Sequence, residues 1–452
     1  MFEYDFKNLE IADIVNSIII YAVSKKASDI HFDPCDSGLK VRLRIDGVLQ
    51  NHAIVPPLYQ KNLITRIKLI SNMNITESRL PQDGAIKSII NGIDLDMRVS
   101  SLTKNLCEKI VIRILDYSKS AEGLESLGFS SQNLEKIKHM INVPNGIILV
   151  TGATGTGKST TVYTMLQTLN KEDTNIITVE DPIEMNIEGI NQVQVNAEIG
   201  LTFGRVLRSI LRQDPNIILI GEIRDSETAQ IAVRASITGH LVFSTVHTNN
   251  SLSTIERLLD MDVERYLLSS ALTGIVSQKL ARKLCPHCRI ERETTQYEKK
   301  VFKEILNKDV DKIWDVNGSC DKCRNGYAGR IAVQEVLLIN DEIRNAINDS
   351  SISREQLQGL VYTDDVTTLL QDGLNKVLEG ITTFEEIYKI IEIDDELDAL
   401  VEREEYREQK ALMKEEKNKN IQAINNVISN ENQTNDTYYD DKTEILDLSQ
   451  LS

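Results

Sequence analysis

The first quarter of the chain contains two kinds of apolar pattern, one that alternates as in strands and one that repeats at helical spacing. Leu39–Ile45 places apolar and basic side chains by turns, which predicts a strand, and the Asp46-Gly47 pair after it is typical of a hairpin turn. Leu9–Lys26 and Leu58–Met73 repeat their apolar residues at helical spacing instead. Further strands are expected at Gly84–Ile90, Ile93–Val99 and Lys109–Leu115. Residues 1–116 are therefore predicted to form an independent α+β domain.

A different pattern follows a linker predicted at residues 117–131. Across residues 132–392, short apolar runs bounded by turns alternate with helical segments. Because these runs show little polar alternation, they suit a central parallel sheet that is covered on both faces, and the fold class predicted is α/β. The strands of this sheet are expected at Ile147–Val150, Asn175–Val179, Ile217–Ile220 and Leu241–Ser244.

The last third of the chain is less regular. Residues 281–335 carry four cysteines and are expected to form a small insertion, and Asp341–Ile391 predicts several short helices. Residues 393–452 hold sixteen Asp and Glu against seven Lys and Arg, so this segment carries over half of the net charge of −17. Its few large apolar residues predict an acidic, disordered tail, for which a solvated spacer is the simplest role.

Composition narrows the class of protein. A chain of 452 residues with 41% hydrophobic residues exceeds one compact core, so two or three domains are expected. The acidic balance argues against a nucleic-acid motor with a broad basic surface, and we expect no nucleic-acid partner. The sequence shows no basic leader and no run of eighteen apolar residues, which predicts a cytoplasmic protein.

The segment Gly152–Ser159 fits the phosphate-loop pattern G-x-x-x-x-G-K-[ST] directly after a predicted strand. Its glycines let backbone N–H groups converge on an anion, and the helix that follows adds its positive N-terminal end. Lys158 is expected to neutralise the β- and γ-phosphates and the Ser159 hydroxyl to hold Mg²⁺. The predicted nucleotide contacts are Gly152, Thr154, Gly155, Thr156, Gly157, Lys158, Ser159 and Thr160.

Acidic residues follow two other predicted strands. Glu222 comes after Ile217–Ile220 and Gly221, where it could orient or deprotonate the attacking water. Glu180 begins a run of three carboxylates in Glu180–Glu184, which would repel one another unless a cation such as Mg²⁺ lies between them. Both positions are expected at the carboxyl edge of the sheet.

Two histidines, His240 and His247, bracket the predicted strand Leu241–Ser244. A single histidine is more often structural than catalytic. Because both lie beside the nucleotide motifs in sequence, we predict that together they sense the γ-phosphate.

Two C-x-x-C pairs, Cys285/Cys288 and Cys320/Cys323, are separated by thirty-one residues. In a reducing compartment such pairs indicate metal ligands before disulfides, and four thiolates suit Zn²⁺ in a closed structural site. Free thiols or a redox pair are the alternatives.

Four blocks in order, GATGTGKS, VEDPIE, ILIGEIRD and TGH…STVHTN, resemble the Walker A, Asp box, Walker B and His box of the GspE/PilB family of secretion ATPases. The likeness covers residues 5 to about 392, including ASDIH at Ala27–His31 and RLPQDG at Arg79–Gly84. It implies a RecA-like P-loop ATPase domain, a PAS-like N-terminal domain and a homohexamer at the cytoplasmic face of the inner membrane. The tetracysteine module resembles that of assembly and secretion members, and is generally absent from pilus-retraction ATPases.

The resemblance also assigns Arg98 and Arg113 as N-terminal arginines that reach the γ-phosphate, which a guanidinium suits because it can pair two phosphate oxygens. A surface ion pair is the alternative for each arginine. Ala85, Cys107 and Ala153 depart from the family pattern, but none of them replaces a proposed catalytic group. The chain begins at the ASDIH domain, so it is expected to be a short form without the extra N-terminal domain of longer members, and without their partner docking or cyclic di-GMP binding.

The function predicted is an ATPase that powers pilin polymerisation in type IV pilus assembly. Domain closure driven by ATP is expected to act on an inner-membrane platform protein, and through it on pilins. A type II secretion or competence-pseudopilus ATPase is the nearest alternative. A non-hydrolysing scaffold and a nucleic-acid translocase are the rivals from other classes.

Overall fold

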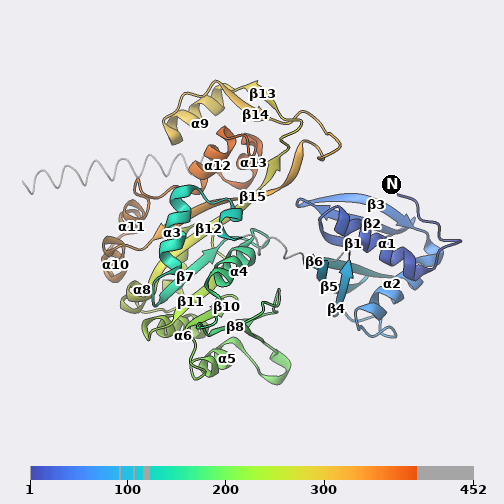
Figure 1. The fold of residues 1–452 in the computed structure, drawn as a ribbon, viewed down its shortest axis with the longest axis horizontal. Coiled ribbons are helices and arrows are strands. Elements are labelled where there is room, and N and C mark those ends of the chain that lie inside the picture. Colours follow the sequence, from blue (N-terminus) through green and yellow to red (C-terminus); the bar gives the residue numbers. More distant parts are fainter. Residues whose placement is uncertain (1, 91–92, 105–106, 116–122, 394–452) are drawn as a thin grey trace, which may run out of the picture.

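The computed structural model describes residues 2–90, 93–104, 107–115 and 123–393, which form two parts built on separate sheets (Figure 1). The predicted acidic tail from residue 394 on lies outside the described residues. So do residues 117–122 of the predicted linker.

The N-terminal part holds a six-stranded sheet in the order β3-β2-β1-β6-β5-β4, in which every neighbouring pair is antiparallel. Asp46, with a φ of 49°, and Gly47, with a φ of 83°, form the turn between β2 and β3 that the sequence predicts. The strands are β1 Ala27–Cys35, β2 Gly38–Ile45, β3 Val48–Val55, β4 Gln82–Ile90, β5 Ile93–Lys104 and β6 Cys107–Leu115.

Two helices, α1 (Ile11–Ser24) and α2 (Pro57–Ile70), cover one face of this sheet. Their apolar stripes and the inward side chains of the strands form one core, because alternate residues of a strand point to opposite faces. The other face carries charged side chains, among them Arg44 on β2 and Arg98 on β5. The face away from the sheet's own helices therefore carries arginines together with acids such as Asp29, which lies within ion-pair distance of Arg44 and Arg113.

The second part is built on a seven-stranded sheet in the order β15-β12-β7-β11-β10-β8-β9. Six of its strands are parallel, and only β15 runs antiparallel, beside β12. The strands are β7 Gly146–Thr151, β8 Ile176–Glu180, β9 Asn191–Gln194, β10 Ile217–Ile220, β11 Leu241–Val246, β12 Leu272–Leu284 and β15 Tyr327–Leu338. The predicted parallel sheet is thus present, with three strands that the sequence pattern did not indicate.

Helices pack on both faces of this sheet, and the strands feed two cores. In β7, Ile147 and Leu149 face one core while Ile148 and Val150 face the other, which is why the run reads as continuously apolar. The first core is completed by α5 Phe203–Ile210, α6 Ser226–Ile237, α7 Ser251–Asp260, α8 Arg265–Ala271, α10 Asp341–Asn348 and α11 Arg354–Val361. The second is completed by the short helix Leu124–Leu127, α3 Ser131–Ile141 and α4 Lys158–Leu169.

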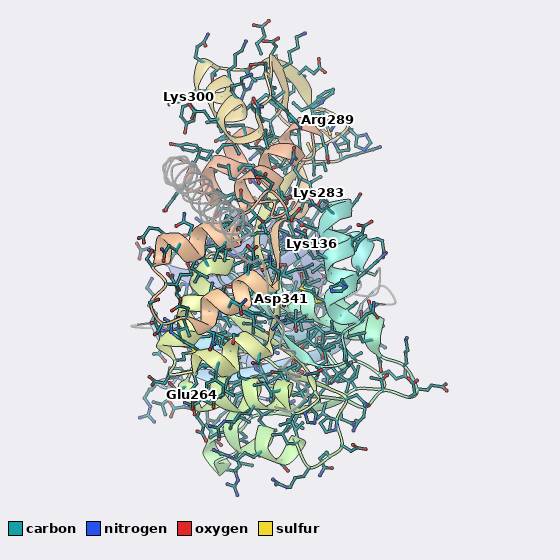
Figure 2. The ribbon with its side chains drawn as sticks, turned by 90° about the vertical axis from the view of Figure 1, so that its left-hand side faces the viewer. Lys136, Glu264, Lys283, Arg289, Lys300 and Asp341 are labelled. Carbon is teal, nitrogen blue, oxygen red and sulfur yellow. The ribbon has the colours of Figure 1, made fainter. Side chains whose placement is uncertain are left out.

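The segment between β12 and β15 leaves the sheet. It contains α9 (Gln296–Leu306) and the two-stranded sheet of β13 (Ile290–Glu293) and β14 (Lys312–Asp315). Its small core includes α12 Leu369–Leu378 and α13 Phe384–Ile390. The ends of the predicted insertion, 281–335, belong to the strands β12 and β15. In Figure 2, Arg289 and Lys300 of this segment lie at one end of the molecule, with Glu264 toward the other.

Polar contacts join the two parts at two places. The backbone N–H of Gly329 donates to the Asp46 carboxylate at 3.2 Å, and Arg324 donates to Gln50 on β3. On another side, Arg98 on β5 donates to the Ile183 carbonyl at 2.6 Å. Within the described residues, no helix is long and apolar enough to cross a membrane.

Candidate active site

The phosphate loop connects β7 to α4 as its sequence predicts. Gly152, Gly155 and Gly157 adopt φ values of 149°, 83° and 88°, a region that L-residues rarely enter. A Cβ on Gly152 would lie 2.5 Å from the Gln278 carbonyl oxygen, so only glycine fits there. The loop is therefore shaped for an anion at the N-terminus of α4.

Gln278 on β12 holds the loop in place, although no local sequence signal indicates this role. The side chain is buried; its Nε2 donates to the Thr156 carbonyl at 2.7 Å, and its Oε1 accepts from the Thr161 hydroxyl at 2.8 Å. Thr156 itself donates to the Ala153 carbonyl at 2.9 Å. One amide thus ties the end of the loop to the first turn of α4.

Lys158 is the buried cation of the site. Its Nζ donates to the carbonyls of Gly152 and Ala153 at 2.8 and 3.0 Å. Burial lowers the pKa of its ammonium, while the charge of Glu222 acts in the opposite direction. The neighbouring Ser159 and Thr160 are exposed at the cleft.

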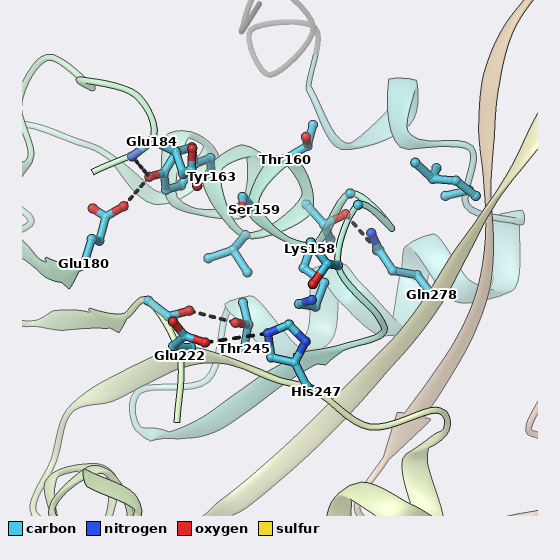
Figure 3. Close-up of a pocket in the computed structure, with 18 of the residues that line it drawn as sticks. Lys158, Ser159, Thr160, Tyr163, Glu180, Glu184, Glu222, Thr245, His247 and Gln278 are labelled. Atoms are coloured by element: carbon cyan, nitrogen blue, oxygen red, sulfur yellow. Dashed lines mark hydrogen bonds and ion pairs between the residues drawn. The ribbon is translucent and has the colours of Figure 1, made fainter. Parts of the chain in front are cut away.

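Glu222 faces this lysine from the end of β10 (Figure 3). Its Oε2 accepts from Arg224 Nε at 2.6 Å and lies 3.6 Å from His247 Nε2. Burial first, and then the charge of Lys158, lower the pKa of His247, which favours the neutral ring near pH 7. A carboxylate, a neutral imidazole and two cations therefore meet beside the phosphate loop.

The structure separates the two histidines that the sequence placed together. His247 follows the carboxyl end of β11 and lines the cleft, whereas His240 precedes Leu241 at its amino end. The six residues of β11 span about 20 Å at the usual rise of a strand. His240 Nδ1 is 2.9 Å from the Ala235 carbonyl instead. The prediction that both histidines sense the γ-phosphate together is therefore corrected, because His240 lies at the amino end of β11 and the cleft lies at its carboxyl end.

Glu180 lines the cleft, but its oxygens already accept hydrogen bonds from the protein. Tyr163 donates to Oε2, while Thr178 and Gln192 donate to Oε1 at 2.5 and 3.1 Å. The side chain is 3% exposed. This carboxylate shapes the loop after β8, in contrast to Glu222, which faces Lys158.

The N-terminal arginines reach the cleft by different amounts. Arg113 on β6 lines it with 59% of its side chain exposed, although its Nε is also 3.2 Å from Asp29. Arg98 stays at the rim, where Nη1 is 3.3 Å from the Glu184 carboxylate. The two arginines are direct cross-strand partners. Both lie on the face of the N-terminal sheet that its own helices leave uncovered.

The cleft has a volume of about 560 Å³ and an apolar side as well as a charged one. Leu127, Leu280 and Ile331 are among the apolar residues that line it. These residues escaped sequence analysis because isolated aliphatic side chains carry no motif. An apolar slot beside a phosphate cradle suits the base of a nucleotide.

The four cysteines of the two C-x-x-C pairs come together outside this cleft. All their sulfurs lie within 4.8 Å of one another, and three of the separations are 3.4, 3.6 and 3.8 Å. Tetrahedral Zn²⁺ with Zn–S bonds of about 2.3 Å places its sulfurs about 3.8 Å apart. The cluster therefore fits a closed zinc site formed by Cys285, Cys288, Cys320 and Cys323.

The glycine loop after β7, Glu222 after β10 and the doubly covered parallel sheet define a P-loop ATPase with a RecA-like fold. The model of the Type II/IV secretion system protein family matches residues 7–389. The chain therefore belongs to this family and is an ATP hydrolase, which confirms the resemblance carried by the four motifs.

Individual relatives agree with this assignment. The chain is 45% identical over 386 residues to the type II secretion system protein E of Dickeya dadantii, covering 83% of this chain and 75% of that protein. It is 43% identical to the type IV pilus assembly ATPase PilB of Thermus thermophilus, over 82% of this chain and 42% of that protein. A crystal structure of the pilus retraction motor PilT with bound ADP superposes with a TM-score of 0.57 at 26% identity, covering 85% of this chain and 97% of that one.

Proposed function

We propose that this ATPase powers pilin polymerisation in type IV pilus assembly, as a homohexamer peripheral to the inner membrane that acts on a platform protein there. The observation that supports a motor is the composite cleft. Lys158 and Glu222 come from the ATPase domain, while Arg113 comes from the N-terminal domain. A site completed by a second domain links the nucleotide to a domain movement.

In the proposed reaction, the loop Gly152–Gly157 and Lys158 hold the phosphates of ATP. Ser159 would bind Mg²⁺, which supplies positive charge against the phosphate oxygens. Glu222 orients the attacking water, because its carboxylate faces Lys158 and lies 3.6 Å from His247 Nε2. His247 contributes a neutral ring nitrogen beside the γ-phosphate. Arg113, with Arg98 at the rim, offers a guanidinium to the charge that develops on transfer.

Glu222→Gln tests the chemical step. The amide keeps the shape of the side chain but loses its charge and basicity, so kcat for ATP should fall by about 10²- to 10⁴-fold with the affinity for ATP retained. Glu304→Gln, an exposed acid on α9, is the matched control and should keep the wild-type rate. Hydrolysis by Glu222→Gln at the normal rate would contradict the catalytic assignment.

A role in type II secretion is the second candidate, because the relative from Dickeya dadantii is named for that system. Deletion of the gene in its host separates the two roles. Loss of surface pili with normal protein secretion supports pilus assembly, and the reverse supports secretion. ATPase activity stimulated by DNA or RNA would favour a translocase instead, and an inactive wild-type chain would favour a scaffold.

The remaining parts of the proposal have direct measurements. Light scattering of the full chain with a non-hydrolysable ATP analogue should give six copies per particle. Pull-down with the membrane platform protein tests the partner. Metal analysis of the purified chain should return one zinc per chain if the four cysteines hold it.

A further inference from the structure

Tyr163 is a buried tyrosine on the phosphate-loop helix, five residues after Lys158. Its hydroxyl lies between two parts of the loop that follows β8: it donates to the Glu180 carboxylate and accepts from the backbone N–H of Glu184 at 3.2 Å. Burial first, and then the charge of Glu180, raise the pKa of this phenol, so it remains a neutral donor at physiological pH. The hydroxyl therefore ties α4 to the segment Asp181–Ile187.

Side chains of β9 hold this segment in place as well. Gln192 Nε2 donates to the Met185 carbonyl at 2.8 Å, and its Oε1 accepts from the Ile187 N–H at 2.8 Å. Gln194 Oε1 accepts from the Ile183 N–H at 3.3 Å. Bonds from Tyr163 and from the two glutamines therefore fix the segment at several points along its length.

The same segment holds an arginine of the other domain. The Ile183 carbonyl accepts from Arg98 Nη2 at 2.6 Å, and the Glu184 carboxylate lies 3.3 Å from Nη1. Arg98 pairs across the strands with Arg113, which lines the nucleotide cleft. Contacts therefore run without a break from the phosphate-loop helix, through Tyr163 and Glu184, to the arginines of the N-terminal sheet.

We propose that Tyr163 is a positioning residue that couples the phosphate loop to the N-terminal domain: it sets the segment Asp181–Ile187 where Ile183 and Glu184 hold Arg98. A shift of α4 on nucleotide binding then reaches Arg98, and its cross-strand partner Arg113, through one hydroxyl. This coupling rests on the proposed function in one respect, since the proposed function is what gives Arg98 and Arg113 their part in the reaction. It goes beyond that function because the proposed function gives Tyr163 no part in holding the phosphates or orienting the water.

Hydrogen–deuterium exchange on the full chain tests the coupling without turnover. In the wild type, a non-hydrolysable ATP analogue should slow exchange in peptides from the phosphate loop and from β5. In Tyr163→Phe, which keeps the ring and its packing, protection of the phosphate loop should persist while that of β5 is lost. Glu184→Gln keeps the backbone N–H to Tyr163 but removes the charge facing Arg98, so it should show the same loss.

Tyr266→Phe is the control, since this exposed hydroxyl bonds Glu264 on the surface, and it should behave as the wild type. Retained β5 protection in Tyr163→Phe overturns the proposal. Loss of protection in both peptides also overturns it, because that result indicates a purely structural tyrosine. A wild type whose β5 peptide shows no protection with the analogue overturns it too. If the exchange pattern holds but the wild type does not hydrolyse ATP, the proposed function fails and the coupling stands.

Turnover gives an independent readout. Tyr163→Phe should lower kcat about tenfold with KM for ATP within about twofold, because the loss falls on the assembly of the closed site. In Arg98→Ala the tyrosine has no arginine to position, so the double variant should be no slower than the slower single variant. Effects that multiply would mean that the two residues act independently, which contradicts the coupling.

Discussion

Replacing Gln278 by leucine tests whether the phosphate loop depends on a residue that carries no motif. The substitution keeps roughly the same volume but removes the donor to the Thr156 carbonyl and the acceptor of the Thr161 hydroxyl. A buried polar group left without a partner costs about 1–3 kcal/mol. The Thr161 hydroxyl can instead donate to a backbone carbonyl one helical turn earlier. The unpaired Thr156 carbonyl therefore accounts for most of the free-energy cost, about 2 kcal/mol.

That cost falls on the conformation of the loop that binds phosphate. If only a few per cent of the molecules keep the loop in its phosphate-binding conformation, the apparent Kd for ATP rises about thirtyfold. The reason is that the apparent affinity scales with the fraction of molecules in that conformation. Titration calorimetry with a non-hydrolysable ATP analogue on the full chain measures this change, and a melting curve records the folded state. Gln278→Glu should bind more weakly still, since a carboxylate would face a carbonyl and the phosphates.

Gln334→Leu is the matched control, a buried glutamine on β15 whose two side-chain polar atoms have no hydrogen-bond partner among the described residues. Its replacement should leave ATP affinity unchanged and keep or raise the melting temperature, because no buried bond is broken. Wild-type affinity in Gln278→Leu, or an equal loss in Gln334→Leu, would refute the reasoning.

Three further outcomes follow from the structure. Cys320→Ser should release the zinc measured by metal analysis and lower the melting temperature of the cysteine module, because three thiolates no longer close the tetrahedron. Gly152→Ala should abolish ATP binding while far-ultraviolet circular dichroism stays native, since its Cβ would meet the Gln278 carbonyl at 2.5 Å. Burial alone would raise the pKa of Glu386, but its bonds to Arg282 at 2.6 and 2.8 Å hold the pKa below its usual value. Glu386→Gln should therefore be less stable than the wild type in urea at pH 7, and this difference should fade as the pH falls below about 4.5 and the wild-type carboxyl is protonated.

Local signals made much of the fold predictable. The apolar run before Gly152 indicates a buried strand because both of its faces are covered. The residues Asp46 and Gly47 indicate the hairpin turn. The strand β12 was missed because it follows α8 directly at Leu272, without a glycine or proline between them. Its partner β15 carries charged residues such as Arg330, which obscure an apolar run.

The site was predictable where chemistry lies in a contiguous motif, as at Lys158 and Glu222. It was not predictable where partners are distant in sequence, as for Gln278, whose bond to Thr156 spans 122 residues. The error at His240 has a simple origin, because a motif that brackets a strand necessarily puts its two ends on opposite edges of the sheet.

The composition of the boundary between the two domains governs how their relative movement responds to temperature. The contacts described there are hydrogen bonds and ion pairs, such as Asp46 with Gly329 and Arg98 with Glu184. No apolar cluster of the described residues includes members from both domains. Parting the domains therefore uncovers little apolar surface, so the heat-capacity change of opening should be small. The opening equilibrium should then follow a nearly straight van 't Hoff line and shift toward the open state as ionic strength rises.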